Sequence, residues 1–537
     1  MSATVLLVHR ISLGCDEPAE AAFAIARARL RPLGVSLKDA VFSVYRKSID
    51  ARKRDHIRLV YSVAVKIPAS VRDIHRLAAA DVGILREEMP ALTVGTEPLA
   101  ARPVVVGTGP CGLFCALTLA EGGYAPILLE RGGTVAERRA AVDRFHKTRI
   151  LDTSTNVQFG AGGAGTFSDG KLVTRISDPL TSHVLRTFVA HGAPETILTA
   201  AKPHIGTDIL SAVVDRMLAH IVALGGEVRY HTTFLGFESQ NGRITCVHTD
   251  HGDLPCGALV LATGHSARDT YAYLLSLGLA VEAKSFSVGM RIEHKTRDID
   301  EALFGSMAGH PALGHAEYAL SHNTSERGVY TFCMCPGGTV VAATSEEEAV
   351  VVNGMSEHLR DGENSNAAVL CSIFKEDYGE SPAQAIALQR SIEHAAFVAG
   401  DSSYATPLTT VGDFLSGVRG TEPSRILPTY MDGQAYTLSS PEEYLPTVAC
   451  RAIAEGLFAF DKKIRGFAAP DAILSGAETR TSAPLRLLRD KDTRLCLGYE
   501  NLYPAGEGAG YAGGITSASV DGIHTARAII ARFAPLS

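Results

Sequence analysis

The stretch from Arg102 to Arg131 constrains the fold of this chain more than any other. The apolar run 104–106 leads directly into Gly107-Thr108-Gly109-Pro110-Cys111-Gly112, a GxGxxG pattern. Apolar residues then recur at helical spacing, and a second apolar run, 126–129, ends at Glu130. A strand, a glycine turn, a helix and a strand in this order are typical of a nucleotide-binding Rossmann unit.

Each part of this unit has a physical role in binding a dinucleotide. The first glycine permits the tight turn, the second lets backbone N–H groups approach a pyrophosphate, and the third lets the helix pack on the strand. The helix N-terminus then faces the anion, and the acid at the end of the second strand can accept both hydrogen bonds of a ribose diol. The predicted cofactor-binding residues of this unit are Gly107, Gly109, Pro110, Cys111, Gly112, Glu130 and Arg131.

Length and charge bound the class of protein. A chain of 537 residues is long enough for two or three domains. Its net charge of -7 argues against a nucleic-acid partner, and we interpret the basic run 52–54 as a solvated face. Because no apolar run could cross a bilayer or form a signal peptide, we expect a cytoplasmic protein without a membrane partner. The ten scattered cysteines fit reduced thiols, and the oligomeric state stays open.

Residues 1–98 predict a small α+β domain of the ferredoxin-like kind. Apolar alternation predicts strands, and a helical period predicts one helix between them. A tract at 92–103, with its prolines and no clear period, predicts a linker. The expected strands are 5–11, 40–45 and 58–67, and the expected helix is 19–30.

A second glycine-rich loop runs from Gly160 to Lys171. No apolar helix follows it, so a second Rossmann turn is not expected, and Leu172 replaces the Ser or Thr that a phosphate loop needs for magnesium. The loop is better explained as backbone lying against a flat or charged ligand. The predicted cofactor-binding residues here are Gly162, Gly163, Ser168 and Lys171, together with Arg138 from an expected helix at 135–145.

Two later stretches of the sequence also predict cofactor-binding turns. After a helix at 209–225 and expected strands at 228–237 and 243–249, the strand 258–261 ends in Ala262-Thr263-Gly264. Near the C-terminus, Gly506-Glu507 and further glycines precede a helix that runs to about Ala531. A Gly-Glu pair before a helix seats the ribityl chain of FAD in many enzymes, and such a helix end could stabilise reduced flavin by up to about 2 kcal/mol. The predicted cofactor-binding residues are Thr263, Gly264, Gly506, Glu507, Gly513, Gly514 and Ile515.

The predicted fold is therefore α/β, with a discontinuous Rossmann-like FAD-binding domain at 99–285 and 471–537. Residues 286–470 show no second nucleotide turn and predict an inserted α+β substrate domain. We expect non-covalent FAD and no permanently bound NAD(P), while NAD(P)H as a transient electron donor is left open. Histidines without a short ligand pattern predict no metal site, and the absence of G-x-S-x-G argues against a serine hydrolase.

Several long stretches carry a resemblance that covers nearly the whole chain. They are 156–171, 327–338, 352–356, 478–482 and 506–514. On these stretches the chain resembles a bacterial family of FAD-dependent dehydrogenases without assigned substrates, a branch of the glutathione-reductase-like flavoproteins. The family usually has Glu at the position of Ala161 and Ser at that of Ala483, which implies a less polar substrate or different acid-base groups for this member.

Flavin chemistry needs a group that takes or supplies a proton near the ring. By position, the predicted catalytic residues are Lys171, Glu478, Arg480 and Tyr511, with Cys335 as a weaker choice. Glu478 and Arg480 lie two residues apart on an expected strand, so an ion pair between them is the alternative. Cys333 and Cys335 would share a strand face, and because they lack C-x-x-C spacing we expect packed side chains.

Three functions remain open at this point. The first is an FAD-dependent dehydrogenase or reductase that moves a hydride between flavin N5 and a small organic substrate. The second is a flavin monooxygenase, and the third is a non-catalytic binding protein stabilised by FAD. The absence of tryptophan excludes the tryptophan motif of flavin halogenases.

Overall fold

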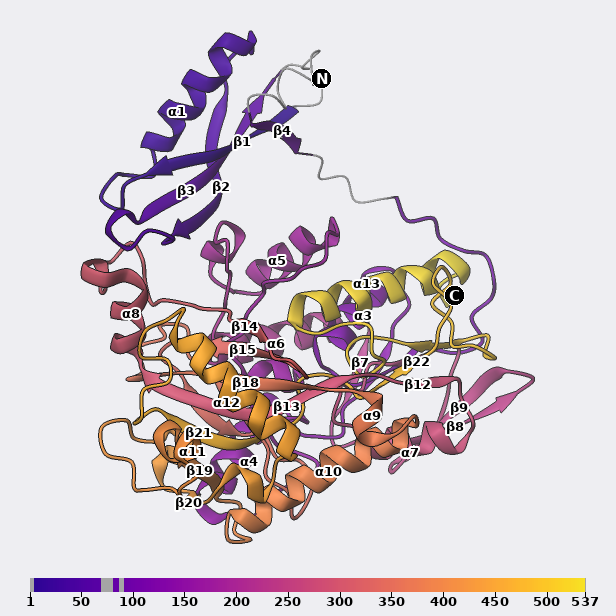
Figure 1. The fold of residues 1–537 in the computed structure, drawn as a ribbon. Coiled ribbons are helices and arrows are strands. Elements are labelled where there is room, and N and C mark those ends of the chain that lie inside the picture. Colours follow the sequence, from indigo (N-terminus) through magenta and orange to yellow (C-terminus); the bar gives the residue numbers. More distant parts are fainter. Residues whose placement is uncertain (1–3, 69–80, 86–90, 537) are drawn as a thin grey trace. The chain divides into compact units, whose positions relative to one another are not determined.

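The computed structural model describes residues 4–68, 81–85 and 91–536 (Figure 1). The chain divides into two compact units. Unit 1 comprises residues 1–90, 177–204 and 297–316, and unit 2 comprises residues 91–176, 205–296 and 317–537. Unit 1 thus includes two later segments that the predicted domain at 1–98 did not contain. These two segments contact the first through interactions that the local sequence does not predict. One of them is the hydrogen bond from the N–H of Lys47 to the carbonyl of Thr199 at 2.7 Å.

Unit 1 is built on a four-stranded sheet with the order β2-β3-β1-β4. Its neighbouring strands are antiparallel, and the order is the one expected of a split βαβ arrangement. The three expected strands are present, although β2 runs five residues beyond its predicted end; residues 69–80, between β3 and β4, lie outside the described residues. The elements are β1 (Thr4–Leu13), α1 (Ala21–Leu30), β2 (Val41–Asp50), β3 (Arg58–Ile67) and β4 (Val82–Leu85), followed in the later segments by α5 (Leu180–Ala190) and α8 (Thr296–Phe304).

Unit 2 contains a five-stranded parallel sheet with the order β23-β11-β5-β6-β7. Four of its short strands are apolar and buried, as expected where both faces of a parallel sheet are covered. The edge strand β7 carries two charged residues and is only half-buried. The C-terminal strand β23 pairs with β11, which itself pairs with β5, so segments far apart in sequence are neighbours. The strands are β5 (Val104–Val106), β6 (Ile127–Leu129), β7 (Glu227–Arg229), β11 (Leu259–Leu261) and β23 (Leu502–Pro504).

Two helices beside this sheet pack closely on each other. A Cβ atom on Gly522 of α13 (Ile515–Arg532) would lie 2.1 Å from the carbonyl oxygen of Cys111 in α3 (Pro110–Glu121), so only glycine allows the approach. Helix α3 follows β5 and helix α13 follows β23, and both strands belong to this sheet. The two helices are labelled near each other in Figure 1. This pairing brings the first and last predicted nucleotide-binding helices together.

For the other elements of this part of unit 2, the sequence predicted helix or strand better than it predicted where each one begins and ends. The strand expected at 228–237 is two strands, because residues 230–233 turn between β7 in the parallel sheet and β8 in a separate antiparallel one. The elements are α4 (Val135–Thr148), α6 (Thr207–Ala223), β8 (Phe234–Gln240), β9 (Arg243–Thr249), β10 (Gly252–Pro255) and α7 (Arg268–Ser276).

A seven-stranded sheet forms the rest of unit 2, with the order β14-β15-β18-β13-β21-β19-β20. Its last strand in sequence, β21, pairs with β13 and β19, although the predicted inserted domain ended at 470. The strands are β13 (Phe286–Lys295), β14 (Ser321–Asn323), β15 (Gly328–Cys335), β18 (Asn364–Ile373), β19 (Thr406–Thr410), β20 (Tyr436–Leu438) and β21 (Ile473–Glu478). Nearby elements are β16 (Thr339–Ala342), β17 (Val352–Met355), α9 (Lys375–Tyr378), α10 (Pro382–Ala399), α11 (Val411–Ser416), α12 (Thr447–Asp461) and the pair β12 (Val281–Ala283) and β22 (Leu485–Leu487).

Within the part of the chain that the structure describes, no helix combines the length and the apolar character that a membrane span requires.

Candidate functional site

A cavity of about 340 Å³ in unit 2 is lined by residues from both large sheets. It brings together the ends of β5, β6 and β11, the starts of α3 and α13, and side chains next to β15 and β21. The predicted site residues that line it are Gly107, Gly109, Pro110, Cys111, Glu130, Arg131, Gly163, Ser168, Lys171, Thr263, Gly264, Glu478, Arg480, Glu507, Gly513, Gly514 and Ile515.

Five predicted residues are not among the described residues that line this cavity. They are Gly112, Arg138, Gly162, Gly506 and Tyr511. A Cβ atom on Gly112 would lie 1.9 Å from the carbonyl oxygen of Gly107, so this glycine serves the packing of α3. The hydroxyl of Tyr511 donates to the carbonyl of Leu487 at 3.0 Å, away from the cavity. The predicted roles of these five residues stay predictions, because they do not line the cavity among the described residues.

The two glycine loops touch each other. Gly107 has a φ of +97°, and a Cβ atom there would lie 2.5 Å from the carbonyl oxygen of Ala262. Gly163 has a φ of +63°, and its Cβ atom would lie 2.8 Å from the Cα of Gly109. Because both positions need left-handed backbone and a close approach, side chains are excluded there. The N-terminus of α3 is left with its backbone N–H groups beside the cavity, as an anion site requires.

Arg138 holds the second glycine loop from inside. Its guanidinium is fully buried and donates to the carbonyls of Asn156, Val157, Ala161 and Gly163 at 2.6 to 2.9 Å. Burial lowers the pKa of Arg138 to about 10, which still leaves it charged at neutral pH. The loop is thus folded around a cation. The predicted contact between Arg138 and a cofactor stays a prediction.

Glu130 has its hydrogen-bonding capacity filled by the protein. Thr108 donates through its hydroxyl at 2.6 Å and its N–H at 3.2 Å, while the N–H groups of Gly132 and Gly160 donate at 3.0 and 2.9 Å. A carboxylate offers about four lone-pair positions, and four donors occupy them. A ribose diol would have to replace some of these bonds, so the predicted role of Glu130 stays a prediction.

Glu507 shows the opposite arrangement. Its carboxylate faces the cavity and makes no hydrogen bond or ion pair with the described residues. Burial raises the pKa of Glu507 to about 7, and the charge of Lys284 only partly offsets this. An unpaired acceptor in a cavity is suited to the hydroxyl groups of a ligand. The residues present therefore fit the ribityl chain of a flavin.

Glu478 and Arg480 do not pair with each other, contrary to the alternative raised by their spacing. Arg291 of β13 donates to both oxygens of Glu478 at 2.7 and 2.8 Å. The same guanidinium binds the side-chain oxygen of Asn366 at 2.8 Å and that of Asn353 at 3.1 Å. Burial lowers the pKa of Arg291, but Glu478 outweighs it and holds the pKa above its usual range. Burial also raises the pKa of Glu478, and Arg291 only partly offsets this.

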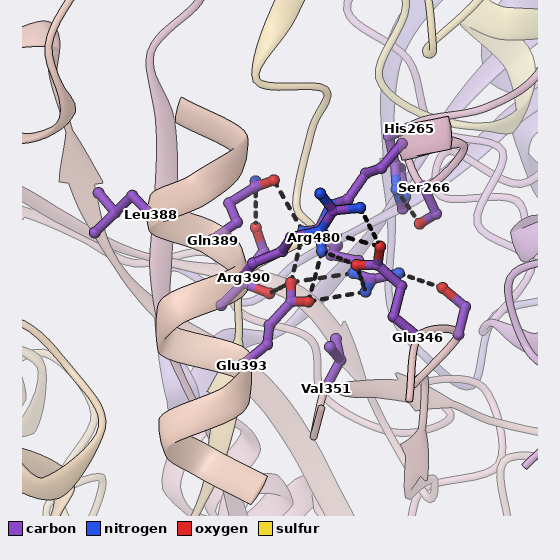
Figure 2. A network of polar contacts seen from close by, with 12 residues as sticks. His265, Ser266, Glu346, Val351, Leu388, Gln389, Arg390, Glu393 and Arg480 are labelled. Carbon is purple, nitrogen blue, oxygen red and sulfur yellow. Dashed lines mark hydrogen bonds and ion pairs between the residues drawn. The ribbon is translucent and has the colours of Figure 1, made fainter. Parts of the chain in front are cut away.

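Arg480 belongs to a second buried cluster, shown in Figure 2. It donates to Glu393 of α10 at 2.8 and 3.1 Å, and Arg268 donates to the same carboxylate at 2.7 Å through each of two nitrogens. Glu346 contacts both arginines. Burial raises the pKa of Glu393, yet the two guanidiniums outweigh it and hold the pKa far below its usual range. The cluster fixes Arg480 at the cavity wall.

Lys171 is also paired. Its Nζ donates to Asp169 at 2.9 Å and to the carbonyl of Met334, while Asp169 is bound by Arg360 and Ser356. Burial lowers the pKa of Lys171, but Asp169 outweighs it and raises the pKa above its ordinary value. Lys171 is thus a permanent cation that can orient a ligand but not accept a proton.

His265 and Cys333 are among the lining residues that the sequence did not assign to the site. His265 directly follows the predicted Gly264, so its position could have suggested it; burial and two nearby arginines lower its pKa to about 3. Cys333 lines the cavity, whereas Cys335 is fully buried. We expected Cys333 to be a packed side chain on the same strand face as Cys335. Instead β15 is irregular between Phe332 and Cys335, and Cys333 lines the cavity.

A second cavity, of about 370 Å³, adjoins the first. The two share Phe332, Thr481 and Gly513. Hydroxyl groups and aromatic rings supply its other described lining side chains, none of which is charged. The remaining lining residues are Ser285, Phe286, Ser287, Tyr330, Ser372, Phe374 and Ser482.

One group of side chains elsewhere could hold a metal ion by its geometry. Cys246, His248 and Asp253 bring their ligand atoms within 4.8 Å of one another on the hairpin of β9 and β10. Asp253 is exposed and pairs with His248 at 2.7 Å, which accounts for the proximity of these two without an ion.

Two regions of the chain match models of protein families. Residues 285–481 match the family described as FAD-dependent protein, C-terminal domain-like, and this region includes Cys333, Glu478 and Arg480. Residues 9–66 match a domain of unknown function. The first match supports FAD as the cofactor and a flavoenzyme as the class of protein.

An uncharacterized protein of Clostridium beijerinckii is 42% identical over 534 residues, covering 98% of both chains. The chain belongs to that protein's family. Identity at this level over the whole length means that the family shares both units. The finer placement of the family among glutathione-reductase-like flavoproteins stays a prediction.

Solved structures of flavin-dependent enzymes also share features with this family member. L-amino acid deaminase from Proteus vulgaris aligns with 12% identity and a TM-score of 0.34, covering 83% of this chain and 94% of that one. Glycine oxidase from Geobacillus kaustophilus aligns with 10% identity and a TM-score of 0.32, covering 80% and 93%. At such TM-scores the likeness carries no weight for the function of this chain.

Proposed function

We propose that the protein is an FAD-dependent oxidoreductase, a dehydrogenase or reductase, that moves a hydride between flavin N5 and a small organic substrate. One observation carries this proposal: two glycine-lined helix starts, at Gly109 and Gly514, line one cavity together with the unpaired Glu507. Such a cavity offers main-chain N–H groups at two places and an acceptor for hydroxyls, which is what a dinucleotide with a sugar-alcohol chain requires.

Different parts of the protein would bind different parts of FAD. The start of α3 would hold the pyrophosphate, Glu507 the ribityl hydroxyls, and the start of α13 the electron-rich edge of the ring. Bound flavin supplies a hydride acceptor or donor at N5. We propose non-covalent binding, with NAD(P)H admitted only as a transient electron donor.

Among the lining side chains, different groups suit different tasks. Lys171 and Arg480 are held as cations by buried carboxylates, so they can orient an anionic group and stabilise developing negative charge. Glu507, whose pKa lies at about 7, can exchange a proton at neutral pH. Glu478 is tied to Arg291 by two hydrogen bonds, which suits it better to positioning than to proton transfer.

The adjoining cavity supports an uncharged substrate. Its described lining offers hydroxyls and phenyl rings without a charged side chain, and it meets the first cavity at Phe332 and Thr481. A substrate held there would reach the larger cavity without burying a charge. We further propose action in the cytoplasm on a small molecule, without a nucleic-acid or membrane partner; the net charge of -7 supports the exclusion of nucleic acid.

The test begins with the colour of the purified protein. We expect a yellow protein whose FAD is released by denaturation, and anaerobic bleaching when a substrate is oxidised. The Glu507→Gln variant should bind FAD more weakly, whereas Glu238→Gln, an exposed carboxylate on β8, should bind it normally. A colourless protein that does not take up flavin would contradict the proposal.

Oxygen reactivity separates this proposal from the alternatives. Reduced protein that reoxidises slowly in air but turns over with a substrate fits a dehydrogenase or reductase. Oxygen insertion into a product would favour the monooxygenase, and flavin binding without turnover by any donor would favour the non-catalytic protein. Anaerobic titration with NADH and NADPH tests the transient donor, since tight stoichiometric binding at a separate site is not expected.

A further inference from the structure

Strand β15 carries an extra residue at the edge of the main cavity. Phe332 pairs with Ala368 of β18 and Cys335 pairs with Asn366, so three steps along β15 match two along β18. Cys333, within this bulge, has a φ of 43°, which residues other than glycine rarely adopt. The bulge breaks the alternation of the strand. As a result Cys333 lines the cavity while Cys335 lies fully buried beside it.

Two cations and a second thiol hold the bulge in place. Arg291 donates to the carbonyl of Cys333 at 3.2 Å, and Lys171 donates to the carbonyl of Met334. The thiol of Cys335 donates to the carbonyl of Cys333 at 3.3 Å. A strained backbone that is fixed from several sides often marks a functional position.

We propose that Cys333 is the nucleophile of a dithiol site, with Cys335 as its resolving thiol, that exchanges with low-molecular-weight disulfides entering the cavity. The site differs from the hydride transfer proposed above, because the exchange needs only the two thiols and the disulfide. Neither the C-x-C spacing nor the sequence alternation predicts it. The proposal is supported by the bulge, by the place of Cys333 in the cavity lining, and by the thiol of Cys335 bound to the Cys333 carbonyl.

The exchange has two steps. The thiolate of Cys333 attacks one sulfur of the disulfide, so that a Cys333–S–S–R bond forms and one thiolate leaves. Cys335 then gives its proton to that thiolate and attacks the sulfur of Cys333, which releases the second thiolate. The protein dithiol is oxidised to a Cys333–Cys335 disulfide, and the small disulfide is reduced to a thiol and a thiolate.

The electrostatics around the sulfur agree with this assignment. The hydrogen bond from Cys335 lowers the pKa of Cys333 to about 6; burial and Asp169 oppose this, while Arg291 and Lys171 reinforce it. The pKa values of the other cysteines are raised, chiefly by burial, except that the Cys333 hydrogen bond is the largest cause at Cys335. Of the ten thiols, Cys333 is the one whose surroundings favour the thiolate, which is the form that a nucleophile requires.

The first experiment measures alkylation of each cysteine by iodoacetamide in the purified full-length protein as isolated, with peptide mapping by mass spectrometry. Near neutral pH we expect Cys333 to label about tenfold faster than the partly exposed Cys15 and Cys246, with a rate that falls below about pH 6. Labelling of Cys333 no faster than these two would overturn the proposal.

The second experiment uses bis(2-hydroxyethyl) disulfide as the probe. Wild-type protein should lose two hydrogen atoms from the peptide that holds both cysteines, after a transient adduct at Cys333. Cys335→Ser should stop at the adduct, and Cys371→Ser, a buried thiol on the neighbouring strand β18, should behave as wild type. Adducts spread over several cysteines, or a stable adduct in wild type, would overturn the assignment of Cys335.

A substitute variant and a measurement of flavin content allow the proposal to be tested in every case. If Cys335→Ser does not fold, Cys333→Ser replaces it and should abolish both adduct and disulfide. Flavin content is measured from the visible spectrum of the same samples. A colourless protein that forms the disulfide contradicts the FAD proposal alone, and a yellow protein with an unreactive Cys333 contradicts this inference alone.

Discussion

The two large sheets of unit 2 contribute to one cavity in different ways. The five-stranded sheet presents mainly backbone, through the glycine turns at Gly107 and Gly163 and the starts of α3 and α13. The seven-stranded sheet and its neighbours present charged side chains, such as Glu478, fixed by partners from distant segments. We therefore expect cofactor binding to depend on backbone shape at the five-stranded sheet and on the balance of buried charges at the seven-stranded sheet. Substitutions at the two sheets should therefore differ in how they affect stability and FAD binding.

The largest effect is expected from Glu393→Gln on the charged side. The change leaves Arg268 and Arg480 buried without their shared carboxylate, so the free energy of unfolding should fall by about 3–5 kcal/mol. Urea denaturation measures this loss. Glu346→Gln is the matched control, because its side chain is 27% exposed and water can replace part of its contacts. Equal losses in the two variants would contradict the idea that the buried carboxylate organises this side.

Glu507 should make stability depend on pH. Its folded pKa is about 7 against an ordinary 4.5, so the unfolded chain releases the proton first as pH rises. Flavin-free protein should lose stability between about pH 4.5 and 7, by at most about 3 kcal/mol, and Glu507→Gln should not. Urea unfolding at several pH values measures the difference. Parallel pH curves for wild type and variant would show that the carboxylate is not desolvated.

On the backbone side, Gly107→Ala should weaken FAD binding by about a hundredfold, because the added Cβ meets the carbonyl of Ala262 and the left-handed backbone is strained. Gly109→Ala sharpens the test, since its Cβ would make only an ordinary contact of 3.8 Å. That variant should keep the stability of the flavin-free protein and weaken FAD binding alone. Flavin titration and thermal unfolding separate the two effects. Wild-type affinity in both variants would mean that this turn does not contact the cofactor.

The smallest effect is expected from Tyr511→Phe, outside both parts of the lining. Loss of the hydrogen bond to Leu487 should cost about 1 kcal/mol of stability. The rate of flavin reduction should stay within about twofold of wild type, whereas Lys171→Met, at the cavity, should lower it by at least about tenfold. Anaerobic stopped-flow reduction measures both. A strong kinetic loss in Tyr511→Phe with normal stability would restore Tyr511 as a catalytic residue.

The glycine-lined half of the cavity could be predicted from the sequence alone. Glycine turns can be read locally, because the need for a left-handed φ or a missing Cβ acts on neighbours in the chain, as at Gly107. For the same reason the strand and helix around that turn, and the helix that follows Gly514, were found where they were expected.

Only the tertiary structure decided which charges pair and which thiol faces the cavity. The partner of Glu478 is Arg291, 187 residues earlier, and not the nearby Arg480. Cys333 lines the cavity because β15 carries one residue more than the facing part of β18, and a bulge leaves no mark in the period of a strand. Ion pairing and strand register depend on residues that come into contact only when the sheet has formed. They therefore cannot be predicted from local sequence patterns.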